Sequence, residues 1–287
     1  MNPILKLNFA NGSQGLLCPL LLLPVLALLC APAFGQSAFP DKALEEAVRK
    51  EVFSKRYNDQ PITKDDVKNI SQVHAKGKGI KDLTGLEHCV ALMEIDFEDN
   101  EITDLKPLAG LKLLQSINLA GNKIEDIQPL KELVAVQYLK LSRNAVQDIS
   151  VLEKMTNMKS LYLSENKIGD IKVLANFTKV WTVYLADNPC KDFETLGKLK
   201  WLSSLNLRSC GISDLSFLKP LTQLKSLNLE DNQLKDLSPL VEMAKGDKER
   251  RFASFWRIYL KGNPIGDGSD SQLGELKEMG ARIKLDK

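Results

Sequence analysis

The chain has 287 residues, of which 44% are apolar and 26% are charged, a balance typical of a folded protein rather than a disordered one. Its formal net charge is only +2, so no overall field draws it to nucleic acid or to an anionic membrane. We therefore expect no nucleic-acid partner.

Residues 1–35 are predicted to be a signal peptide. The run LLCPLLLLPVLALLCA at 16–31 is apolar and uncharged, and the small residues of APAFG suit cleavage after Ala33 or Gly35. The run is shorter than the roughly 20 apolar residues that span a bilayer, so no integral membrane contact is expected after cleavage. We expect a secreted, periplasmic or cell-surface protein. The long preceding segment, charged only at Lys6, leaves an uncleaved anchor or a misread start codon open.

Residues 36–69 are predicted to form a helical N-terminal cap. Asp41 lies at the start of a helix expected over 39–53, and a second short helix is expected at TKDDVKNI, residues 63–70. Apolar residues of the first helix recur near helical spacing at Leu44, Val48, Val52 and Phe53.

Residues 70–267 contain a 22-residue repeat. Its pattern is L-x-x-L-x-L-x-x-N-x-I-x-x-I-x-x-L-x-x-L, and an asparagine or its substitute marks each copy. Lys78 stands at this position in a weaker first copy. The last copy comes nine residues late, which places an insert at about 244–254. The other marked positions form a predicted structural ladder: Asn100, Asn122, Asn144, Asn166, Asn188, Cys210, Asn232 and Asn263.

This pattern resembles the leucine-rich repeat, specifically the 22-residue class of bacterial internalin-like proteins and the similar repeats of phosphatase regulators. The resemblance implies an α/β solenoid: a curved horseshoe with short parallel strands on its concave face. One repeat cannot bury enough apolar surface to fold alone, so nine stacked repeats with capped ends are expected. The C-terminal cap is predicted at 268–287, as a short helix ending at Gly280 and a strand with Ile283 and Leu285 facing inward.

Several regularly placed aspartates and cysteines could suggest metal binding or thiol chemistry, but we interpret them as structural. An aspartate follows each ladder position by four residues, and its sequence context predicts a cap on a short outer helical turn rather than a calcium site. Cys89, Cys190 and Cys210 replace buried residues of the repeat. A bridge between Cys190 and Cys210 is conceivable, although no pattern indicates it.

The chain shows no phosphate loop, zinc cysteine pair or GxSxG elbow after its first 35 residues, so we expect a non-enzymatic protein without cofactor or metal. One alternative is a metal-dependent hydrolase at the acidic end around His74 and Asp96. Another, if the signal peptide is misread, is an intracellular protein similar to the phosphatase regulators.

The variable residues beside the strand leucines are expected to face the concave surface, where solenoids usually bind their ligands. We predict a monomer that binds a macromolecule, foremost a protein, through tyrosines set among small polar residues. The predicted contact residues are Tyr138, Lys140, Tyr162, Tyr184, Asn206, Arg208, Asn228 and Tyr259.

Overall fold

The computed structural model describes residues 37–249 and 251–285, and every structural statement below refers to them. The described residues belong to one compact unit. The expected signal peptide lies outside the described residues. Among the helices in the described ranges, none is both long and apolar enough to cross a membrane.

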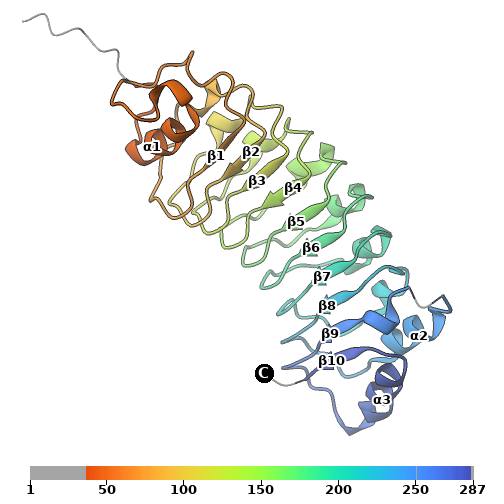
Figure 1. Cartoon of the computed structure of the whole chain (residues 1–287). Coiled ribbons are helices and arrows are strands. Elements are labelled where there is room, and N and C mark those ends of the chain that lie inside the picture. Colours follow the sequence, from red (N-terminus) through yellow and green to blue (C-terminus); the bar gives the residue numbers. More distant parts are fainter. Residues whose placement is uncertain (1–36, 250, 286–287) are drawn as a thin grey trace, which may run out of the picture. The chain divides into compact units, whose positions relative to one another are not determined.

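Ten short strands form one parallel sheet in chain order, as Figure 1 shows, and this confirms the predicted leucine-rich repeat solenoid. In β1 to β9 the middle residue is buried while the first and third lie on the open face, because successive side chains of a strand point to opposite faces. The strands are β1 Gln72–His74, β2 Glu94–Asp96, β3 Ser116–Asn118, β4 Tyr138–Lys140, β5 Ser160–Tyr162, β6 Thr182–Tyr184, β7 Ser204–Asn206, β8 Ser226–Asn228, β9 Arg257–Tyr259 and β10 Arg282–Lys284.

Short 3-10 helices return the chain on the opposite side of the core. An aspartate precedes most of them and accepts the backbone N–H two residues later, as Asp126 does from Gln128 at 2.8 Å. Asp192 differs: its backbone has a left-handed φ of 59°, and its side chain makes no cap bond. The helices between β2 and β8 are η3 Lys106–Leu108, η4 Gln128–Leu130, η5 Ser150–Lys154, η6 Lys172–Asn176, η7 Phe193–Lys198 and η8 Ser216–Leu218.

The N-terminal cap is built on helix α1, Lys42–Glu51. Asp41 caps it by accepting the N–H groups of Ala43 and Leu44 at 3.0 and 3.2 Å. The other carboxylate oxygen of Asp41 accepts the N–H of Lys81 at 2.9 Å, so one side chain joins the cap to the first repeat. Leu44 and Val48 are fully buried against that repeat.

Two expectations for this cap are wrong. Residues 64–69 form turns and not a helix, because their backbone bonds reach back three residues, from Asp66 N to Thr63 O and from Ile70 N to Val67 O, and do not continue as an α-helical ladder. The first helix, expected over 39–53, is shorter: α1 ends at Glu51 and Val52 adopts an extended backbone, which leaves Phe53 84% exposed. The short helix η1, Phe53–Lys55, follows.

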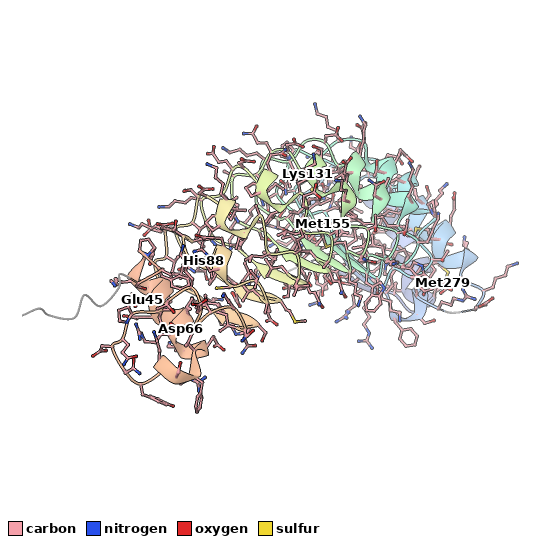
Figure 2. The ribbon with its side chains drawn as sticks, turned by 90° about the horizontal axis from the view of Figure 1, so that it is seen from above. Glu45, Asp66, His88, Lys131, Met155 and Met279 are labelled. Carbon is pink, nitrogen blue, oxygen red and sulfur yellow. The ribbon has the colours of Figure 1, made fainter. Side chains whose placement is uncertain are left out.

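The C-terminal end departs from the repeat on its outer side. Helix α2, Ser238–Gly246, replaces a 3-10 turn, and after a loop and helix η9, Ala253–Phe255, strand β9 pairs with β8 in the expected register. Helix α3, Asp270–Glu278, precedes β10. Figure 2 shows Glu45 of the first cap and Met279 of the last at opposite ends. Leu285 is 37% exposed because β10 ends at Lys284, so its expected inward position is wrong.

Candidate partner-binding surface

The ladder asparagines join neighbouring repeats through their amides. Asn166 donates from Nδ2 to the carbonyl oxygens of Leu141 and Leu163, at 3.0 and 2.9 Å, and its Oδ1 accepts the N–H of Val146 at 3.0 Å. An amide can make these bonds because it holds a donor and an acceptor on one rigid group. The same donations recur at Asn100, Asn122, Asn144, Asn188, Asn232 and Asn263.

Cys210 occupies the equivalent place with weaker bonds. Its Sγ donates to the carbonyl oxygens of Leu185 and Arg208 at 3.4 and 3.5 Å. Cys89, Cys190 and Cys210 are all free and buried. A hydrogen bond with Cys210, together with burial, raises the pKa of the Cys190 thiol, and burial raises the pKa of Cys89 to about 12. Cys89 and Cys190 therefore stay protonated and have little nucleophilic character near neutral pH.

The concave face carries a cluster of three tyrosines from consecutive strands. The ring centroids of Tyr138 and Tyr162 are 5.3 Å apart, and those of Tyr162 and Tyr184 are 5.0 Å apart with an edge-to-face angle of 80°. All three side chains are half-buried. Burial raises the pKa of Tyr138, so its hydroxyl stays protonated at neutral pH.

Lys140 and Arg208 lie beside these tyrosines, but each is held by an acid of the same face. Lys140 Nζ lies 2.7 Å from Glu98 Oε2, and the Arg208 guanidinium pairs with Asp187. Hydrogen bonds from Lys140 and Asn118 lower the pKa of Glu98 to about 2 against the effect of burial. Glu98 is therefore ionised at every physiological pH, and the centre of the face is largely neutralised from within.

The remaining predicted contact residues also lie on this face. Asn206 and Asn228 occupy the same column as Tyr184 and Tyr259, since all four pair in register across β6 to β9. Asn228 donates to Glu230 at 3.1 Å, and Lys284 Nζ lies 5.2 Å from the centroid of the Tyr259 ring. The structure thus places one continuous column of polar and aromatic side chains on the concave side.

The acidic end around His74 is organised by pairing. His74 Nε2 lies 3.2 Å from Glu94 Oε1, and Asp96 Oδ1 accepts from the Asn118 amide at 3.0 Å. Within the described ranges no group of three His, Cys, Asp or Glu side chains is placed to hold a metal ion.

Two exposed tryptophans were not among the contact residues predicted from the sequence. Trp181 is 54% exposed and Trp201 is 63% exposed, and both lie just before strands, at the edge of the sheet where β6 and β7 begin. With Thr182, Ser203, Ser204, Gln223 and Lys225 they line a cavity of about 370 Å³. Comparing the residues before each strand, and not only those within it, could have found them.

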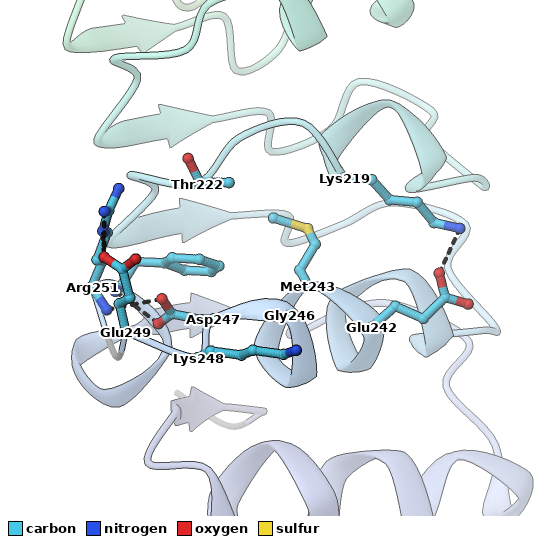
Figure 3. Close-up of a pocket in the computed structure, with 10 residues that line it drawn as sticks. Lys219, Thr222, Glu242, Met243, Gly246, Asp247, Lys248, Glu249 and Arg251 are labelled. Atoms are coloured by element: carbon cyan, nitrogen blue, oxygen red, sulfur yellow. Dashed lines mark hydrogen bonds and ion pairs between the residues drawn. The ribbon is translucent and has the colours of Figure 1, made fainter.

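A second cavity of about 510 Å³ lies beside the insert, and Figure 3 shows its lining. Among its lining residues, Lys219 Nζ lies 2.6 Å from Glu242, and Arg251 pairs with Glu249. The Asp247 carboxylate accepts the N–H groups of Phe252 and Ala253, at 3.0 and 2.8 Å, which orders the loop. These contacts give the polar groups of the insert a structural role.

Comparisons with known proteins agree with the geometry. Residues 90–132 and 134–176 match the family "Leucine Rich repeats (2 copies)", and residues 198–215 match "Leucine Rich repeat". No curated protein matches the chain by sequence.

Solved structures show the same architecture. Internalin C2 of Listeria monocytogenes is 31% identical with a TM-score of 0.68, over 72% of this chain and 91% of that one. Internalin F of the same organism is 24% identical with a TM-score of 0.71, over 88% and 78% of the two chains. A leucine-rich repeat protein of Leptospira interrogans, 19% identical over 70% and 56% with a TM-score of 0.57, shares the fold.

Proposed function

The chain belongs to the internalin-like leucine-rich repeat proteins, and from this premise we propose that it is an exported, non-enzymatic protein that binds a protein partner on its concave face. Leucine-rich repeat proteins typically mediate protein–protein interaction, and their extended concave surfaces suit that role. The proposed contacts are the tyrosine cluster, Tyr138, Tyr162 and Tyr184, and the column that continues from it.

The tyrosine cluster is the observation that carries this proposal. Three half-buried rings form a chain of contacts, with centroids 5.3 Å apart from Tyr138 to Tyr162 and 5.0 Å apart from Tyr162 to Tyr184. Such rings lose little conformational entropy on binding and are common anchors in protein interfaces. Asn206 and Asn228 continue the column as adaptable hydrogen-bonding groups.

We propose export because residues 16–31 form an apolar run typical of a signal peptide and because the chain is similar to internalins. When the full chain is expressed in a bacterial host, we expect the mature protein to begin at Phe34 or Gln36. N-terminal sequencing of the purified product measures this. A product that keeps residues 1–35 and stays inside the cell contradicts export and favours the intracellular alternative.

The double substitution Tyr162→Ala and Tyr184→Ala is expected to weaken partner binding by at least about tenfold, because it removes two anchors from the centre of the surface. A photo-reactive residue at Ser160, which pairs with Tyr138 and Thr182 in the sheet, should cross-link the partner. The same residue at exposed Lys131, on an outer turn, should not. Quantifying the cross-linked product with both tyrosines present and absent gives the measurement.

Tyr57→Ala is the matched control, since Tyr57 is 90% exposed in the N-terminal cap, away from the concave face. It should leave cross-linking unchanged. Circular dichroism should show both tyrosine variants folded. Undiminished cross-linking from Ser160 in the double variant would remove the tyrosine cluster from the binding site.

A further inference from the structure

Exposed apolar side chains gather along one edge of the sheet. Of the ten large apolar residues exposed in the described part of the chain, seven lie within four residues before a strand. We call this the start edge, meaning the four residues that precede each strand together with the first residue of that strand. The seven are Val90, Met93, Leu113, Val134, Trp181, Trp201 and Phe255. Scattered exposed apolar residues are ordinary, but an alignment along one edge indicates an interaction surface.

The part of this edge at strands β5 to β9 is also basic. The segments 156–160, 178–182, 200–204, 222–226 and 253–257 contain no acidic residue. They carry five cations: Lys159, Lys179, Lys200, Lys225 and Arg257. Among the described residues none of these five forms an ion pair, whereas Lys140 and Arg208 on the concave face are both paired. Their charge is therefore available to a partner.

The two tryptophans add a shaped site to this charged edge. Trp181 and Trp201 flank the cavity of about 370 Å³, and Lys225 lies in its lining. The hydroxyl and amide groups of Thr182, Ser203, Ser204 and Gln223 complete the lining, and these groups can pair with a peptide backbone. Ser204 Oγ lies 3.3 Å from the Tyr184 hydroxyl, so this cavity adjoins the tyrosine cluster.

We propose that the start edge from Lys159 to Arg257 is a second binding surface, distinct from the tyrosine cluster, for an acidic protein segment. An aromatic or aliphatic side chain of that segment lies between Trp181 and Trp201, and its carboxylates face the unpaired cations. Indole rings supply large apolar contact area, and complementary charge gives specificity and faster association. This surface goes beyond the concave site proposed above and does not depend on it.

The test uses peptides of defined sequence as probes. Random 12-residue peptides displayed on phage are selected on the folded protein, and those enriched are expected to be acidic and to contain an aromatic or aliphatic residue. A selected peptide should bind at least about tenfold more weakly to Trp181→Ala/Trp201→Ala. Lys159→Gln/Lys225→Gln should also weaken it, and added salt should do the same.

Three controls separate this proposal from others. Tyr138→Ala/Tyr162→Ala, which keeps the Tyr184 hydroxyl beside Ser204, should leave peptide binding within about twofold, so the two surfaces can fail independently. Binding should shift the fluorescence emission of Trp181 and Trp201. Trp256 is fully buried, so its emission should not change. Heparin serves as an anionic polysaccharide: tryptophan-dependent binding of heparin without binding of acidic peptides would overturn the proposal. Enrichment of neutral or basic peptides, no enrichment, or binding that survives the tryptophan substitutions would overturn it as well.

Discussion

Replacing Asn166 with alanine is expected to lower the free energy of unfolding by about 3 to 5 kcal/mol, because the change leaves several buried backbone groups without partners. The side chain donates to Leu141 O and Leu163 O and accepts from Val146 N, all within 3.0 Å. These bonds cross from one repeat to the next, so their loss also weakens the interface on which a solenoid depends. Urea denaturation followed by circular dichroism measures the change.

Two matched substitutions show whether the ladder bonds are responsible. Asn157→Ala removes an exposed amide that only accepts from Lys179 at 2.9 Å, and its cost should stay within about 0.5 kcal/mol. Cys210→Ala removes a ladder residue whose single S–H is shared between two carbonyl oxygens, at 3.4 and 3.5 Å, so its cost should be intermediate. Equal losses for Asn166 and Cys210 would show that the amide bonds contribute little.

The core could be predicted from the sequence because its apolar residues recur at a strict period. The 22-residue spacing placed the ladder and the inward residues of β1 to β8, and β9 kept its register despite the nine-residue insert. The same spacing placed Tyr162 and Tyr184 in one column, as their pairing shows. Periodic positions are predictable because each repeat must match its neighbours to bury its apolar surface.

Features set by local backbone turns, or by ion pairs between distant repeats, could not be predicted in the same way. Residues 63–70 carry the residue types of a helix start, but the backbone closes single turns there, with Asp66 N donating to Thr63 O. The pairing of Lys140 with Glu98 joins strands two repeats apart, and the repeat pattern says nothing about side-chain partners at that range. Trp181 and Trp201 lie outside the strands, in positions the pattern leaves variable.

The backbone conformation of the residue before each ladder position could be predicted only in part. Its backbone has a left-handed φ, for example 67° at Gly121 and 60° at Arg143. The glycines at these positions indicate the conformation, but Arg143 and Glu165 adopt it without any such signal. The following asparagine holds the turn, so local preference is overridden by the ladder bonds.

The substitution Gly85→Ala is expected to lower the free energy of unfolding by about 2 to 5 kcal/mol and to release the N-terminal cap. Gly85 has a φ of 106°, which costs an alanine about 1 to 2 kcal/mol. A Cβ there would also lie 2.6 Å from Ala38 O and from Phe39 Cδ1, and relieving that overlap adds about 1 to 3 kcal/mol. Phe39 is buried at the junction of cap and first repeat, so the overlap pushes the two apart.

Two other glycines divide this cost into its parts. Gly79 has a φ of 72° with open space around it, so Gly79→Ala measures backbone strain alone, at about 1 kcal/mol. Gly110 is open as well and has no positive φ, so Gly110→Ala should be nearly neutral. Hydrogen exchange should become faster in α1 for Gly85→Ala only. Of the three glycines, only Gly85 would place a Cβ against Phe39 of the cap. If Gly85→Ala and Gly79→Ala cost the same and α1 stays protected, contact with Phe39 does not hold the cap in place.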